Sequence, residues 1–189
     1  MAVNAAFFPS PNRAKGSSDE GRLTKMKRLI LMRHGEAVRP HAGIEDFDRS
    51  LDDEGRSESR RMGLALAEAG YVPDLALVSA ARRTLETWAA AAAAFPDDVA
   101  VEQGRKFYAA SAVTLSIAVT EAADKAGTIM VVGHNPGIHQ FAMHLAQQAG
   151  APRLDRFPTG SAAVFGFDGE GRPSFERSLM ARDLRDRAK

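Results

Sequence analysis

The sequence contains no cysteine among its 189 residues. This absence excludes a disulfide framework, a thiol nucleophile and any metal site built from thiolates, and it is typical of proteins from a reducing compartment. An excess of charge is also missing, because 25 basic residues are balanced by 24 acidic ones. Nothing therefore indicates a general attraction to nucleic acid or to an anionic membrane, and an anionic ligand would have to be bound by a few locally placed arginines.

Long hydrophobic runs are absent too. No run approaches the ~20 apolar residues that a membrane-spanning helix needs. A short apolar patch at residues 5–8 is followed at once by Pro9 and has no basic region before it, which argues against a secretory signal. We therefore expect a soluble, cytoplasmic protein that has neither a membrane partner nor a nucleic-acid partner.

Residues 1–25 differ from the rest of the chain. They contain several prolines, glycines and serines and show no sustained periodicity, which predicts a flexible N-terminal extension. Met26 stands directly before a core-like apolar run. The extension is therefore either a dispensable arm or a segment that is left out when translation begins at Met26, and the sequence leaves both open. Residues 26–189 have the length of one domain.

Apolar runs and helical periodicities alternate along this domain. The run Leu29–Met32 is apolar at every position, as in a strand that is buried on both faces of a parallel sheet. Two strands, 162–167 and 174–179, flank a turn-forming segment as in a hairpin. The alternation predicts an α/β fold, a three-layer α/β/α sandwich with a mainly parallel central sheet. The other predicted strands are 74–79, 99–102 and 128–133, and the predicted helices are 55–69, 83–95, 112–125 and 137–148.

Residues 36–54 form a polar stretch between the first strand and the first helix. Long loops at the carboxyl ends of strands are where α/β proteins usually place function. This loop carries several acidic residues, among them Glu45, Asp46 and Asp48. Because their spacing is not that of a ligand set, we predict that the acids are solvated and that they form no metal site.

The run Arg33-His34-Gly35-Glu36 follows the first buried strand directly. An arginine and a histidine at this point must leave the core or be satisfied within it. Gly35 allows the backbone to turn sharply or to approach a ligand closely. Taken alone, the run is equally well explained as a loop that happens to begin with charged residues.

Two further strands end in basic residues. Ser79 closes one strand, and Arg82 and Arg83 then open a helix, where free N–H groups and a forked guanidinium both favour phosphate. A solvated arginine pair would also explain them, although basic residues are disfavoured at this end of a helix. His134 follows the strand at 128–133. Since ligands of open parallel sheets bind outside the carboxyl ends of the strands, the three segments predict one binding edge. The other histidines are predicted at the surface: His41, His139 and His144.

Together these runs resemble the histidine phosphatase superfamily, which includes the cofactor-dependent phosphoglycerate mutases and acid phosphatases. Its opening signature is the run at residues 33–36, and its last element is the glycine–histidine turn at 133–134. Between them lies a serine-led strand end with an arginine four residues before a threonine, and Thr87 makes Arg83 rather than Arg82 the match. The small size and the lack of a large cap insertion resemble the compact SixA-like branch of phosphohistidine phosphatases.

The resemblance implies a phosphoglycerate mutase-like fold for residues 26–189 and a phosphatase that uses neither a metal nor another cofactor. It implies that His34 is the nucleophile and carries the phosphoryl group as phosphohistidine. Arg33, Arg83 and a protonated His134 would donate to the phosphoryl oxygens. Arg33 and Arg83 thus bind substrate, while Glu36 either binds substrate or orients the nucleophile. The implied partner is a protein that carries phosphohistidine or a small phosphorylated molecule.

A general acid is not evident. Larger relatives place a glutamate after the third strand, where this sequence has residues 101–108, and Glu102 does not align with it convincingly. An imidazole leaving group needs less protonation than an alkoxide, because its conjugate acid has a pKa near ~6.5. The missing acid therefore favours phosphohistidine in proteins over alkyl phosphate esters.

Three other interpretations remain open. A small-molecule phosphomonoester phosphatase or a mutase of the same superfamily would carry the same motifs, although a mutase usually needs a longer cap to exclude water. A catalytically inactive phosphoprotein-binding module would keep the fold without turnover, which the intact set of two arginines and two histidines argues against. A nucleotide-binding protein is disfavoured because no glycine-rich phosphate loop follows any predicted strand.

Overall fold

A six-stranded β-sheet forms the centre of the computed structural model, which describes residues 25–184. Its strands are β1 (Arg28–Arg33), β2 (Leu75–Ser79), β3 (Ala100–Gly104), β4 (Thr128–Gly133), β5 (Ala162–Phe167) and β6 (Pro173–Leu179). Their spatial order is β3-β2-β4-β1-β5-β6. The first four strands in this order pair in parallel, whereas β5 pairs antiparallel with β1, and β6 antiparallel with β5. The sheet is therefore mainly parallel, with the predicted hairpin at one edge.

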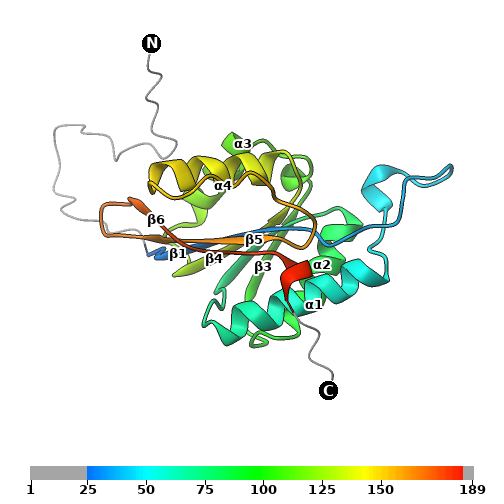
Figure 1. Ribbon diagram of the computed structural model, residues 1–189, viewed down its shortest axis with the longest axis horizontal. Helices are drawn as coiled ribbons and strands as arrows, with labels where there is room; N and C mark the ends of the chain where they lie inside the picture. The colour runs from blue at the N-terminus through cyan, green and yellow to red at the C-terminus, as the bar shows by residue number, and fades with distance from the viewer. Residues whose placement is uncertain (1–24, 185–189) are drawn as a thin grey trace, which may run out of the picture.

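Helices cover both faces of this sheet (Figure 1). They are α1 (Asp53–Glu68), α2 (Arg82–Ala92), α3 (Ala112–Ala122) and α4 (Gly137–Gln148). The first two helices lie on one face, and α3 and α4 lie on the other. The predicted three-layer α/β/α sandwich is thus confirmed.

The alternating side chains of β1 supply both cores. Leu29 and Leu31 join a cluster on the side of α3 and α4 that includes Phe141. Ile30 and Met32 point the other way and join a second cluster with Met62 of α1. All four β1 side chains are fully buried, which explains why the strand is apolar at every position rather than at every second one.

Helix boundaries follow local signals. Asp52 caps α1, with its Oδ1 accepting from the N–H of Gly55 at 2.8 Å, and Ser111 caps α3 in the same way. The predicted end of the second helix at residue 95 is too late, because α2 ends at Ala92. Residue 95 precedes Pro96, and a proline disfavours helical geometry in the residue before it.

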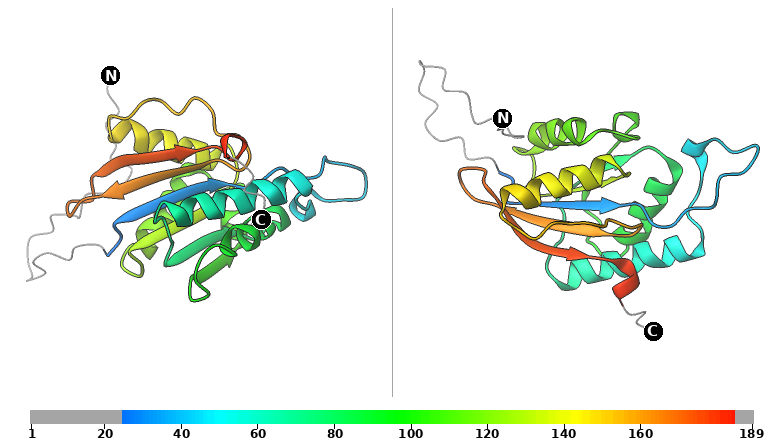
Figure 2. Two further views of the ribbon diagram at one scale, coloured as in Figure 1. Left: turned by 60° about the horizontal axis from the view of Figure 1, so that its bottom comes forward. Right: turned by 45° about the horizontal axis from the view of Figure 1, so that its top comes forward.

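The segment between β1 and α1 has more structure than predicted. It contains a short 3-10 helix, η1 (Asp46–Asp48), and its two arms are joined by a bridge between Ala37 and Leu51. Figure 2 shows the segment projecting beyond the sheet at the carboxyl end of β1. The loop thus extends the edge at which the predicted site lies.

Strand register brings the predicted site segments to one edge. Arg33 pairs with Gly133, and Val78 pairs with Val132, so the residues that follow β1, β2 and β4 leave the sheet side by side. The predicted extension at residues 1–25 lies outside the described residues apart from Lys25. Within residues 25–184, no helix combines the length and the apolar character that a membrane crossing requires.

Contact between α1 and α2 depends on a glycine, which yields a test of the packing. A β-carbon at Gly63 would lie 2.2 Å from the carbonyl oxygen of Ala91. We expect Gly63→Ala to lower the free energy of unfolding by roughly 1–3 kcal/mol, because overpacking outweighs the gain of about 0.5–1 kcal/mol that alanine brings to a helix. Urea unfolding measures this. Leu64→Ala, on the solvent side of the same helix, is the control, and an unchanged or raised stability of Gly63→Ala would contradict the packing.

Candidate active site

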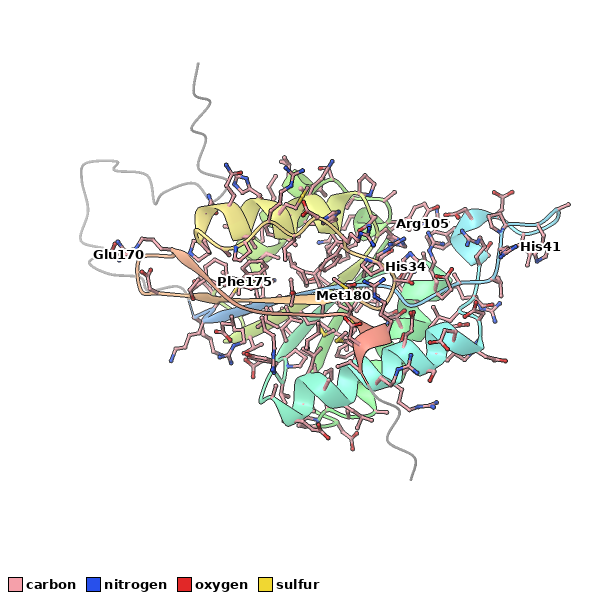
Figure 3. All side chains as sticks on the ribbon, in the orientation of Figure 1. His34, His41, Arg105, Glu170, Phe175 and Met180 are labelled. Carbon is pink, nitrogen blue, oxygen red and sulfur yellow. The ribbon has the colours of Figure 1, made fainter. Side chains whose placement is uncertain are left out.

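A cavity of about 370 Å³ opens at the carboxyl edge of the sheet. Figure 3 places His34 at this edge, whereas His41 lies far out on the projecting loop. The lining comes from the end of β1, the loop before α1, the start of α2 and the segment before β5: Arg33, His34, Glu36, Ala37, Arg49, Arg83, Pro158 and Thr159. Because three of these residues are arginines, the cavity suits an anion.

His34 is neutral, and one of its two ring nitrogens keeps a lone pair. It is 9% exposed, and its Nδ1 lies 2.8 Å from the carbonyl oxygen of Gly35. Since a carbonyl only accepts, Nδ1 carries the proton and Nε2 keeps its lone pair. Burial, with the nearby charges of Arg83 and Arg33, lowers the pKa of His34 to about 4. Near pH 7 the side chain is therefore an unprotonated imidazole.

Gly35 fixes the path of the backbone after His34. A β-carbon at this position would lie 2.4 Å from the carbonyl oxygen of Gly55 in the first turn of α1. The N–H of Gly35 donates to Oγ1 of Thr87 in α2 at 3.1 Å. The turn after β1 is thus held against both helices of one layer, and this contact sets the position of the His34 ring.

Arg83 lies between the two histidines. It belongs to the first turn of α2 and is only 6% exposed. Its Nε donates to Nε2 of His34 at 3.3 Å, and its Nη2 lies 3.2 Å from Nδ1 of His134. Arg82 points elsewhere and pairs with Glu86 at 2.8 Å. The choice of Arg83 over Arg82 in the sequence therefore agrees with the geometry.

The pKa of His134 is lowered as well, so its ring is neutral in the free protein, whereas the protonated donor expected from the sequence belongs to the complex with a phosphoryl group. Burial is the main cause and lowers its pKa to about 3, with further contributions from His34 and Arg83. Its Nδ1 accepts from Arg83, so the ring proton lies on Nε2, which donates to Oγ of Ser79 at 2.8 Å. A further positive charge beside buried Arg83 and half-buried Arg33 is unfavourable in the free protein.

Arg33 and Glu36 line the cavity on the side of the segment before β5. Arg33 donates from Nη1 to the carbonyl oxygen of Phe157 at 3.0 Å. Glu36 accepts at Oε2 from Thr159 Oγ1, also at 3.0 Å. The structure thus brings all five predicted site residues to one place, although Arg33 is anchored to the backbone and not to His34.

Sequence reasoning missed Arg49, Asp46 and Tyr108. Arg49 lines the cavity and donates to Asp46 Oδ1 at 2.7 Å. Asp46 is not merely solvated as predicted, because its Oδ2 also pairs with Arg83 at 3.0 Å and accepts from Tyr108 OH at 2.7 Å. The available signal was the position of this loop directly after a site-bearing strand.

Two other predicted features lie away from the cavity. Glu102 is paired with Lys106 at 2.8 Å and is 40% exposed at its side chain, which agrees with its poor alignment to the acid of larger relatives. His139 is half-buried rather than on the surface, since its ring stacks on Phe157. Among residues 25–184 no cluster of three or more histidine, aspartate or glutamate side chains is placed to hold a metal ion.

Comparisons with known proteins bear on the family and the fold of the chain. The family model of the histidine phosphatase superfamily (branch 1) matches residues 29–108. An uncharacterized protein from Mycobacterium tuberculosis is 31% identical over 139 residues, which cover 70% of this chain and 85% of the relative. The crystal structure of a protein assigned as the phosphohistidine phosphatase SixA from Agrobacterium tumefaciens is 28% identical, with a TM-score of 0.72 over 82% of this chain and 97% of that one.

A tungstate complex of the protein histidine phosphatase SixA has the same fold, with a TM-score of 0.71 at 21% identity over 84% of this chain and 99% of that one. The family model and the SixA structures that share the fold point the same way. The chain therefore belongs to the histidine phosphatase superfamily and is a phosphatase.

Proposed function

We propose that this phosphatase removes the phosphoryl group from phosphohistidine in proteins, through a phosphohistidine intermediate on its own His34. The observation that carries the proposal is the neutral His34 ring, whose Nε2 lone pair lies beside the Nε of Arg83 at 3.3 Å. An imidazole nucleophile must be unprotonated to attack phosphorus, and the transferring group needs fixed cations around it. This cavity supplies both.

The chemistry proceeds in two displacements. Nε2 of His34 attacks phosphorus, and the new N–P bond forms while the leaving group departs with the electron pair of its own bond to phosphorus. Water then attacks the phosphorus of the intermediate, releases inorganic phosphate and returns the lone pair to Nε2. Arg33 and Arg83 stabilise the charge on the phosphoryl oxygens in both steps, and Glu36 contacts the substrate from the rim of the cavity.

The acidic groups near the cavity favour a leaving group that needs no strong acid. Glu102 is held by Lys106 away from the cavity. Hydrogen bonds from Tyr108 and Arg49 hold the pKa of Asp46 well below its usual range, so that its carboxylate has no proton to give. Phosphohistidine leaves as neutral imidazole once its second ring nitrogen is protonated, and an ordinary imidazole takes up a proton near neutral pH, with a pKa of about 6.5.

Replacement of the nucleophile tests the intermediate. We expect His34→Ala to lower turnover by more than a thousandfold and to abolish the phosphoenzyme, because no other group attacks phosphorus. The measurement is mass spectrometry of acid-labile, alkali-stable phosphate on enzyme quenched during turnover. His41→Ala, in the exposed part of the same loop, is the matched control and keeps both signals. A phosphoryl adduct on any other residue would refute the assignment.

The pH dependence of His34 tests its protonation state. Because its pKa is lowered to about 4, the ring stays neutral as the pH falls from 7 to 5, where about nine tenths of the molecules still lack the proton. Protonation, and with it loss of the nucleophile, occurs as the pH falls through about 4. An NMR titration of the His34 ring, assigned with His34→Ala, measures this while circular dichroism monitors folding. A midpoint near 6.5 in folded protein would contradict the neutral nucleophile.

Substrate preference tests the absence of a strong acid. We expect kcat/KM to be at least tenfold higher on chemically phosphorylated polyhistidine than on glucose 6-phosphate, because neither Asp46 nor Glu102 can protonate the alkoxide of the sugar. Both rates are measured as phosphate release under the same conditions. Faster hydrolysis of the sugar phosphate would instead identify the small-molecule phosphomonoesterase that the sequence left open.

A further inference from the structure

Asp46 joins three segments of the chain around Arg83. Its Oδ1 accepts from Arg49 at 2.7 Å, and its Oδ2 accepts from Tyr108 OH at 2.7 Å and from Arg83 Nη2 at 3.0 Å. The backbone carbonyl of Asp46 also accepts from Nη1 of Arg83. These contacts connect the projecting loop with the start of α2 and with the residue that follows η2 (Arg105–Phe107).

The contacts of Arg83 separate along the two edges of its guanidinium. Asp46 takes the edge formed by Nη1 and Nη2, through its carbonyl and its carboxylate. The edge formed by Nε and Nη2 faces His34 and His134. A guanidinium can bind an oxyanion with two parallel hydrogen bonds along one edge. In the free protein this edge donates to the two histidines, so a phosphoryl group that binds beside the nucleophile takes over these two donors.

Asp46 is not placed to compete with the phosphoryl group. It does not line the 370 Å³ cavity, which is bounded instead by Arg83, Arg49 and residues near His34. Tyr108 supports the arrangement from the other side, with its ring edge-on to His134 at 5.4 Å between ring centroids. A carboxylate with three donors from separate segments forms a network, which holds its geometry better than an isolated surface pair.

We propose that Asp46 is the positioning residue that holds Arg83 by its outer edge, so that the inner edge meets the phosphoryl oxygens beside His34. The inference rests on the proposed function, because it assigns Arg83 to the phosphoryl group. A long arginine side chain loses rotamer entropy when it is fixed, and Asp46 removes this freedom before substrate binds. Binding energy is then available to stabilise the transition state.

The test compares two aspartates of η1. Asp46→Asn removes the charge that holds Arg83, whereas Asp48→Asn removes the same charge two residues later in the same short helix, where the side chain is likewise exposed. We expect Asp46→Asn to lower kcat on phosphorylated polyhistidine by roughly tenfold to a hundredfold with a smaller change in KM. Inhibition by inorganic vanadate weakens by a similar factor, and Asp48→Asn leaves both values unchanged.

A double-mutant cycle with Tyr108→Phe adds a readout that mere loss of stability would not move. If both residues act through Arg83, the double variant loses less than the product of the two single effects. If the wild-type enzyme turns over through His34 but Asp46→Asn has the same kcat and the same vanadate inhibition as Asp48→Asn, the positioning role alone is overturned. Faster turnover or tighter vanadate inhibition in Asp46→Asn would show that the Asp46 carboxylate competes with the phosphoryl group for Arg83. This result would also overturn the positioning role. Lack of any His34 adduct in the wild type would instead refute the proposed function.

Discussion

The contact between Arg83 and His34 is the constraint on which the rest of the site depends. A guanidinium stays charged at every pH at which the protein is folded. With Nε 3.3 Å from Nε2 of His34, it adds to the effect of burial and keeps that ring neutral. The same cation attracts the phosphoryl group that the neutral ring attacks. One residue thus keeps the ring unprotonated, with its lone pair accepting from Nε, and supplies the charge that draws the electrophile to it.

The fold delivers this contact through strand order. Adjacent β1, β4 and β2 end together, so that the histidines that follow β1 and β4 face the helix that follows β2. Glycines allow the backbone segments to approach this closely: a β-carbon at Gly137 would lie 1.9 Å from the carbonyl oxygen of Ala110. Rigid strand ends and helix starts thus set the inner edge of the site, while the loop between β1 and α1 supplies its outer side.

The inner edge of the site was predictable from the sequence and the outer side was not. Buried strands such as Leu29–Met32 are visible because every position is apolar, and residues that end such strands must meet at one edge. Asp46 and Arg83, by contrast, are 37 positions apart, and the loop between β1 and α1 has no periodicity from which its path follows. The lowered pKa of His134 in the free protein was not predictable for a related reason, because burial depends on what packs around the ring and not on its neighbours in sequence.

The two states of His134 follow from one balance of charge. In the free protein Arg83 donates to its Nδ1, and burial beside this cation excludes a further proton. A bound phosphoryl group brings a charge of about −1.5 to −2 to the same place, and an opposite charge within a few ångströms raises the pKa of a histidine. Ser79 keeps the existing proton on Nε2, so a proton taken up with the substrate enters at Nδ1. We therefore expect His134 to become the donor that the sequence predicted only once the cavity holds its anion.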